Sequence, residues 1–289
     1  MKTSSIITLT LFFLLLNVNS QDINSDFSPN SEILEKFTKL SQQQLLDTAH
    51  YYSRNLINDT ALILYNLIIN TPAKDADIEQ QKRKVNAYNS SACIHEQMCD
   101  YRTAYELLIK ALLLCEKIEY ESYKSNIYNN FGNIYQTFNK YDIAKSYYLT
   151  ALNLCDDSTK MVAILSNLGA AELGVERFDS ALFFFNKSLQ ISKSDNKFIT
   201  YIMNNIAALY SKTKQYDSTY HYLKLSLDES IKLKNNEALV LSNLGSFFIE
   251  IQKNDNDSAL HYINLSNAIA KENNFLDILS YNYYFLSKY

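Results

Sequence analysis

The amino-acid sequence predicts an all-α solenoid, in which helix pairs repeat along the chain. Two observations predict this fold class. The 289 residues include only four Gly and two Pro, fewer than strands joined by tight turns need. A pattern of small and aromatic residues also recurs at intervals of 37 to 43 residues. Self-similarity at such a period is typical of a solenoid.

The clearest repeat lies at residues 129–154, which read as two amphipathic helices joined by a turn at 138–141. Small residues at Gly132 and Ala144 alternate with large apolar ones such as Tyr148. Helices whose small residues face each other can pack closely. We therefore expect this stretch to form one antiparallel helix pair of a longer array.

Each first helix carries one small residue that sets the register, called the anchor below. The anchors are Ala49, Ala92, Gly132, Gly169, Ala207 and Gly245. Twelve residues after each of the first five anchors comes Ala or Thr. We expect Gly169 and its counterpart Ala181 to be buried where the two helices of the fourth pair cross.

The second helices share a starting motif, an aromatic residue followed by Asp, in three of the repeats. The carboxylates concerned are Asp142, Asp179 and Asp217. A carboxylate at a helix N-terminus accepts hydrogen bonds from free N–H groups and opposes the positive end of the helix dipole. These three residues are therefore expected to cap their helices.

The order of small residue, aromatic, Ala, aromatic and Ala resembles the tetratricopeptide repeat, over nearly all of residues 42–289. The resemblance implies a right-handed solenoid of about six helix-turn-helix repeats plus an incomplete seventh. The repeats exceed the family's length of about 34 residues, the family's Pro is missing, and Glu172 replaces an aromatic residue. Such long repeats resemble the extended-helix subtype. The expected units lie near 42–75, 85–118, 125–158, 162–195, 200–233, 238–273 and, in part, 275–289.

The first 20 residues read as a signal peptide, with Lys2 at the start and an apolar run at 6–16. That run is too short to span a bilayer, and small residues precede an expected cleavage site near Ser20. An uncleaved N-terminal anchor is the alternative. A linker at 21–31 then leads into the solenoid at 32–289. The protein is expected to be exported, and to be periplasmic or extracellular, with no transmembrane segment in the mature chain.

Several functional classes are disfavoured. The net charge of −4 and the pI near 5.6 argue against a nucleic-acid-binding surface, which needs clustered basic residues. The sequence contains no phosphate-binding loop, metalloprotease motif or nucleophile elbow, and its four His are scattered. No catalytic residue, metal site or cofactor is therefore expected. The cysteines fit no zinc signature; buried thiols are preferred over disulfides, whose presence stays open.

The resemblance implies that the first helices line a ligand-binding face. Residues six and three before, and one and four after, each anchor share a helical face. Side-chain amides there can donate to and accept from an extended peptide backbone, although this Asn-rich composition alone would place some amides there. The polar candidates are Asn86, Asn89, Glu96, Asn126, Asn129, Asn133, Gln136, Ser166, Tyr201, Asn204, Ser211, Ser242 and Ser246.

A second Asn series stands two residues before four of the anchors, at Asn130, Asn167, Asn205 and Asn243. Its regular recurrence favours hydrogen bonds between helices. The ligand-binding face carries no Lys or Arg in the second to sixth repeats, so the family's basic clamp for a C-terminal carboxylate is not expected here.

The sequence thus predicts a non-enzymatic, exported scaffold that binds a protein or peptide. The alternative is the extracytoplasmic sensor region of a longer bacterial signalling or transcription-regulatory protein. At a spacing of 38, Tyr283 falls at the seventh anchor, and aromatic residues gather around it. An exposed aromatic stripe usually marks an interface, so we expect either a longer chain or a homodimer through the C-terminal helix.

Overall fold

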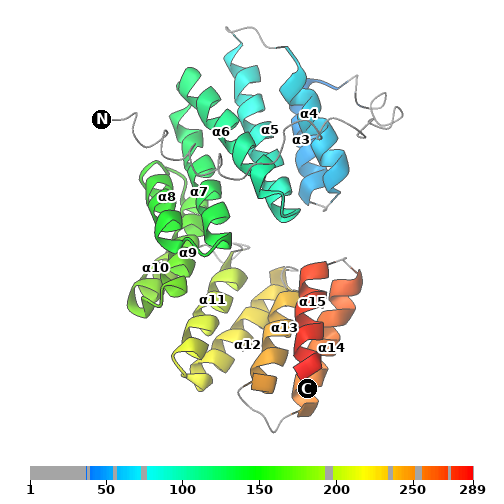
Figure 1. Cartoon of the computed structure of the whole chain (residues 1–289), viewed down its shortest axis with the longest axis vertical. Helices are drawn as coiled ribbons and strands as arrows, with labels where there is room; N and C mark the ends of the chain where they lie inside the picture. Colours follow the sequence, from blue (N-terminus) through cyan, green and yellow to red (C-terminus); the bar gives the residue numbers. More distant parts are fainter. Residues whose placement is uncertain are drawn as a thin grey trace, which may run out of the picture. The chain divides into compact units, whose positions relative to one another are not determined.

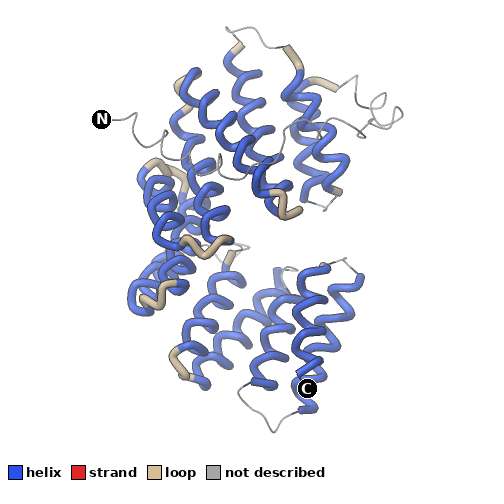
Figure 2. The backbone as a smooth tube through the Cα atoms, viewed as in Figure 1, coloured by secondary structure: helices blue, strands red, loops and turns tan. Residues whose placement is uncertain are grey.

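The computed structural model describes residue 37 and residues 40–54, 57–72, 77–192, 198–233, 237–250, 256–272 and 275–288. This described part contains thirteen helices and no strand (Figures 1 and 2). The signal peptide and linker expected at 1–31 lie outside it. The chain divides into two compact units, residues 1–64 and residues 65–289, which are treated separately.

The first unit contains α3 and the start of α4. Helix α3 buries Leu45, Leu46 and Ala49, so the first anchor lies in a core. The rings of Phe37 and Tyr52 meet edge to face, with their centroids 6.2 Å apart.

Six first helices and six second helices alternate along the described part of the chain. The first helices are α3 (Gln42–Arg54), α5 (Ile78–Gln97), α7 (Glu121–Thr137), α9 (Ser158–Gly174), α11 (Ile199–Lys212) and α13 (Glu237–Glu250). The second helices are α4 (Asn58–Asn70), α6 (Tyr101–Lys117), α8 (Tyr141–Asn153), α10 (Phe178–Ile191), α12 (Tyr216–Leu233) and α14 (Asn256–Glu272). Helix α15 (Leu276–Lys288) takes the place of a seventh first helix and packs on α13 and α14. The prediction of an all-α solenoid with six repeats and an incomplete seventh is confirmed.

In the second unit, the glycine anchors Gly132, Gly169 and Gly245 are buried against the second helix of the same repeat. Gly169 is buried, and a Cβ atom added to it would lie only 2.5 Å from Cε1 of the Phe185 ring. Phe185 and Ala181 are both fully buried on α10. The expected burial of Gly169 and Ala181 is confirmed, and the fourth helix pair approaches so closely because Gly169 has no side chain.

The turns between paired helices use a left-handed residue other than glycine. In the third repeat Asn139 has φ 56°. The N–H of Asn139 donates to the carbonyl of Gln136, and the N–H of Lys140 donates to that of Tyr135, both over 2.9 Å. This pair of bonds closes a helix end as a Schellman motif does. Cys99, Glu176 and Lys214 also have positive φ in such turns, and Glu119 has it in the turn between α6 and α7. The sharp turns therefore form without the glycines that this chain lacks.

The expected capping by aspartate is wrong for two of the second helices. Helix α8 has Lys140 at its N-cap and α10 has Arg177, and neither makes a side-chain capping bond. Asp142 and Asp179 lie inside the first turn. The preceding aromatic residue already occupies the first helical position, so each carboxylate falls beyond the cap. It can still oppose the helix dipole. In α5, by contrast, Asp77 does cap, accepting from the N–H of Gln80 over 2.9 Å.

Glu172 is a buried charge inside the fourth repeat, where most repeats carry an aromatic residue. Its side chain is 1% exposed and forms ion pairs with Lys145 of α8 and with Arg177. Lys145 is 31% exposed and Arg177 51%. The carboxylate thus depends on cations from the third and fourth repeats, while both cations keep access to water.

None of the described helices is both long and apolar enough to cross a membrane.

The four cysteines are free thiols. Cys115 is buried and Cys93 and Cys155 are partly so, but Cys99 is exposed in the turn before α6, which corrects the expectation that all four are buried.

Candidate functional site

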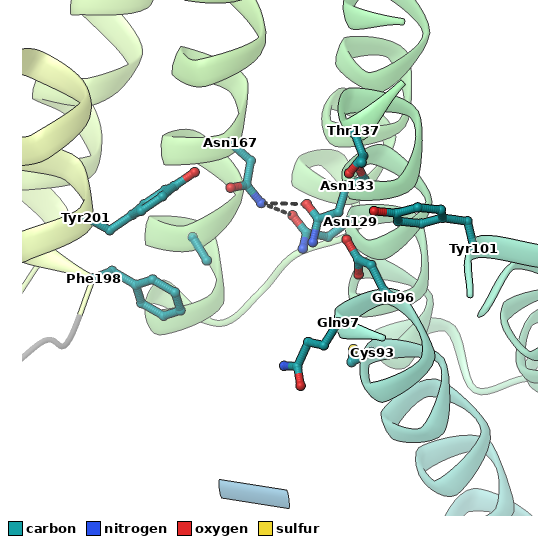
Figure 3. A pocket seen from close by; sticks show the side chains of 11 residues that line it. Cys93, Glu96, Gln97, Tyr101, Asn129, Asn133, Thr137, Asn167, Phe198 and Tyr201 are labelled. Atoms are coloured by element: carbon teal, nitrogen blue, oxygen red, sulfur yellow. Dashed lines mark hydrogen bonds between the residues drawn. The ribbon is translucent and has the colours of Figure 1, made fainter. Parts of the chain in front are cut away.

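An open groove of about 860 Å³ crosses four successive first helices of the second unit. Helices α5, α7, α9 and α11 all contribute side chains to it, and α6 contributes its first residue. Phe198 and Tyr201 lie on one side of the groove, and Glu96 and Gln97 on the other (Figure 3). The lining residues are Cys93, Glu96, Gln97, Tyr101, Asn129, Asn133, Thr137, Ala163, Asn167, Phe198 and Tyr201.

Four of the residues expected on the ligand-binding face line this groove together: Glu96, Asn129, Asn133 and Tyr201. Asn126 lines an adjoining hollow of about 160 Å³, where Lys160 is also found. The remaining candidates lie outside both linings, namely Asn86, Asn89, Gln136, Ser166, Asn204, Ser211, Ser242 and Ser246.

Three of those candidates are not on an open face, and the first of them, Asn89, is only 7% exposed. Ser166 and Ser242 are both fully buried. Each stands three residues before its anchor, and the following first helix covers that position. Helix periodicity places a residue on a face, but it does not show how much of that face the next repeat hides.

Cys93 and Ala163 hold positions of the expected face, but five other lining residues were missed: Gln97, Tyr101, Thr137, Asn167 and Phe198. Gln97 and Thr137 each stand five residues after an anchor, so the open face extends one position further than expected. Phe198 is the N-cap of α11 and comes before any periodic position of its helix. Asn167 belongs to the series that was expected to be structural. It forms hydrogen bonds between helices and also lines the groove.

Hydrogen bonds between side-chain amides connect successive first helices; we call them the amide ladder. Each donor stands two residues before its anchor, and each acceptor stands three residues before the preceding anchor. The bonds are Asn130 to Asn89 (2.9 Å), Asn167 to Asn129 (3.0 Å) and Asn243 to Asn204 (3.0 Å). The expected structural role of Asn130, Asn167 and Asn243 is confirmed.

The ladder also limits what the groove amides can offer a ligand. The Oδ1 atom of Asn133 accepts from Asn167 over 3.1 Å and from the hydroxyl of Tyr148 over 2.9 Å, while Oδ1 of Asn129 accepts from Asn167 (Figure 3). Their carbonyl oxygens are therefore engaged within the protein. At Asn129 and Asn133 a ligand meets mainly N–H donors, which suit the carbonyl groups of an extended peptide backbone.

The ladder is interrupted between the fourth and fifth repeats. The acceptor position holds Ser166 in place of Asn, and the donor is Asn205. The Oγ atom of Ser166 and the Nδ2 atom of Asn205 are both buried and have no hydrogen-bond partner in the described part of the chain. Serine lacks the amide group that reaches the donor in the other repeats. The α9–α11 contact therefore contains two unsatisfied polar atoms, each of which costs free energy.

Replacing Ser166 with asparagine is expected to restore this bond and to raise the free energy of unfolding by about 1 kcal/mol. Urea denaturation of the wild type and of Ser166→Asn measures the change. The matched control is the same substitution in an Asn205→Ala background, where the donor is gone and the gain should vanish. An equal gain in both backgrounds would show that the benefit does not come from the ladder.

Helix α15 is also joined to the preceding first helix, α13, by a buried hydrogen bond between side chains. Asn282 is fully buried and accepts from the Oγ atom of Ser242 over 2.5 Å. Its Nδ2 atom donates to Ser266 and Asn267 of α14. Ser242 stands three residues before its anchor, as the acceptors of the amide ladder do, but here it is the donor and Asn282 is the acceptor. Tyr283, where the seventh anchor was expected, is 52% exposed and therefore does not occupy a buried position like those of the other anchors.

The electrostatics of the groove centre on Glu96. Burial raises the pKa of its carboxyl to about 7, because removal from water disfavours the charged form. Burial likewise raises the pKa of the Cys93 thiol to about 12, so this cysteine stays protonated and unreactive at neutral pH. The described residues hold no group of three or more His, Cys, Asp or Glu that could hold a metal ion.

Comparison with protein families gives one match. Residues 84–157 and 126–194 match the model of the tetratricopeptide repeat. These residues include α5 to α10 almost entirely, and with them most of the groove. A comparison with curated proteins gave no significant match.

Solved structures share the fold at low sequence identity. RapI in its apo form is 16% identical with a TM-score of 0.59, over 85% of this chain and 95% of that one. Cut9, crystallised with Hcn1 as an APC/C hetero-tetramer, is 16% identical with a TM-score of 0.61, and the match covers 87% of this chain and 45% of that one. PilF of Pseudomonas aeruginosa is 17% identical with a TM-score of 0.51, and the match covers 79% of this chain and 91% of that one. At such identities these structures speak for the fold alone.

Proposed function

Because the repeats of this chain belong to the tetratricopeptide-repeat family, we propose that the protein is a non-enzymatic scaffold that holds a protein or peptide ligand in the groove across α5, α7, α9 and α11. Repeats of this family imply a protein-interaction surface. We assign this general role to the groove and to the residues that line it.

The observation that carries the proposal is the composition of the groove. Amide N–H groups of α7 face an open channel that is flanked by the aromatic rings of Phe198 and Tyr201. N–H donors suit a peptide backbone, and aromatic rings suit apolar or planar side chains. The groove draws on four repeats, so an extended segment of several residues can lie across it.

A groove-filling substitution tests this function. Ala163 lines both the groove and the adjoining hollow, and Ala163→Trp is expected to weaken ligand binding at least tenfold by occupying that space. The control is Ser146→Trp, at an exposed position of α8 outside the groove. Binding of peptides selected on the wild type is measured for both by titration calorimetry. Equal affinity in all three proteins would place the ligand elsewhere.

We further propose that the protein acts outside the cytoplasm. The charged start, short apolar run and small residues of positions 1–20 support export. N-terminal sequencing of the protein recovered from its natural cell checks this, with cleavage after Ser20 as the expected result. The alternative function, the sensor region of a longer signalling protein, rests on the same export signal.

A homodimer through α15 is also proposed. This helix exposes Leu276, Tyr281, Tyr283 and Tyr284, with between 44% and 73% of each residue open to solvent, while Phe285 is buried. A second copy of this face would cover the exposed rings. Light scattering on the purified chain would report twice the monomer mass.

A further inference from the structure

We propose that the groove selects a ligand segment carrying a basic side chain, a guanidinium or an ammonium group, which pairs with Glu96. This inference rests on the proposed function, since it names the ligand class for the same groove.

The charge of the groove carries the inference. Of the eleven residues that line it, Glu96 alone has an acidic or basic side chain. The described part of the chain gives its carboxylate neither a hydrogen bond nor an ion pair, although it is partly buried. A partly buried carboxylate without a partner gains most from a cationic one. An acidic ligand would meet repulsion at the same point.

The neighbouring rings add to the selection. Tyr101 lies beside Glu96, close enough to interact with it electrostatically, and Phe198 and Tyr201 face it across the groove (Figure 3). Aromatic faces attract guanidinium and ammonium groups, and a planar guanidinium also stacks on them. A basic side chain at Glu96 would therefore meet its counter-ion beside the Tyr101 ring, with the rings of Phe198 and Tyr201 on the opposite side of the groove.

The binding should also depend on pH near neutrality. Besides Glu96, the titratable groups around the site are Cys93 on α5, Tyr101 at the start of α6, Tyr148 on α8 and Tyr201 on α11. Burial raises the pKa of the Cys93 thiol and of the Tyr148 phenol, and a hydrogen bond with Cys99 raises that of Tyr101. Helices α7 and α9 contribute only uncharged residues to the lining. Among the groove-lining groups whose pKa is raised, only Glu96, with a pKa of about 7, changes its charge between pH 6 and pH 8.5.

The direction of the pH dependence follows from the charge of Glu96. Above pH 7 the carboxylate is ionised and can pair with a cation, whereas at pH 6 about nine in ten Glu96 side chains are protonated. Arginine keeps its charge throughout this range. Affinity for an arginine peptide should fall about tenfold from pH 8.5 to pH 6.

The experiment uses the full chain and N-acetylated, C-amidated octapeptides of randomised sequence in three series. The central residue is arginine in one series, its uncharged isostere citrulline in the second and glutamate in the third. The peptides retained best are then titrated against the wild type and Glu96→Gln. The control variant Lys160→Gln removes the cation of the adjoining hollow.

We expect retained peptides to come from the arginine series and to lose at least tenfold in affinity when arginine becomes citrulline. Glu96→Gln should cause a similar loss for the arginine peptide, abolish its pH dependence and leave the citrulline peptide unaffected. Lys160→Gln should not weaken the arginine peptide. Glutamine has the shape of the protonated side chain, so this variant is expected to fold, and its thermal midpoint checks that.

The other outcomes overturn one claim or both. Retention of neutral or acidic peptides in a manner that Ala163→Trp abolishes would keep the groove as the binding site and reject the basic ligand. An arginine peptide bound equally by the wild type and Glu96→Gln would also reject it. Failure of every series to bind at millimolar concentration would reject peptide binding in the groove altogether.

Discussion

Replacing Lys145 with methionine is expected to lower the free energy of unfolding by about 3 kcal/mol. The substitution leaves the Glu172 carboxylate, only 1% exposed, without its ion-pair partner from α8. Removing one member of a buried pair costs about 3–5 kcal/mol, because a charge stays buried without compensation. The low end applies here, since Arg177 still reaches Glu172.

Urea denaturation measures this loss. The control is a substitution that removes the buried carboxylate itself. Glu172→Tyr removes the buried charge and restores the aromatic residue found at this position in the third and fifth repeats, Tyr135 and Tyr210. The two cations are partly exposed and can turn to water, so this variant should be neutral or more stable. The double variant should recover most of the loss. A Lys145→Met protein as stable as the wild type would mean that Glu172 does not need the pair.

Gly169→Leu is expected to cost about 3 kcal/mol, at the upper end of the range for overpacking. Even a methyl group at Gly169 would approach the fully buried Phe185 ring to 2.5 Å, and a leucine adds three more carbons. The ring cannot move aside without displacing α10.

The matched control for that variant is Ala208→Leu, which adds similar bulk to α11 at an exposed position. It should change stability by less than about 0.5 kcal/mol. Thermal unfolding of the two variants side by side separates packing at the anchor from a general effect of leucine in a first helix. Equal midpoints for the two would contradict the close crossing at Gly169.

The fold could be predicted from the sequence because its repeats are set by local features. Anchors such as Gly169 recur at a nearly fixed interval, and a position that must accept a neighbouring ring tolerates only a small residue. The Asn series two residues before the anchors was interpretable for the same reason. Recurrence at one position of every repeat indicates a contact that every repeat makes.

The candidate site could be predicted only in part. Periodicity placed Glu96, Asn129, Asn133 and Tyr201 on one face, but it placed Ser166 there too. Whether a residue of that face is open depends on how the next first helix lies across it, and that is a tertiary property. Phe198 was missed because it precedes the first turn of α11, where helix periodicity has no meaning.

Charge and capping show the same limit. Asp142 and Asp179 have the right chemistry for N-caps, yet a shift of two positions puts them inside the helix. Glu172 was recognised as a departure from the aromatic pattern, but its partner Lys145 stands 27 positions earlier in the chain. Only the packing of α8 on α9 brings the two together.

The central claim is that the ligand lies in the groove across α5, α7, α9 and α11, and photo-crosslinking tests it most directly. A benzophenone-bearing phenylalanine replaces Phe198 in the groove wall or, in the control, Phe183, which is 59% exposed on α10. Irradiation of cells that make the full chain should yield an adduct from position 198. No such adduct should form from position 183, or from position 198 in a chain that also carries Ala163→Trp. The same adduct from position 183, or an adduct at 198 that survives Ala163→Trp, would contradict the account.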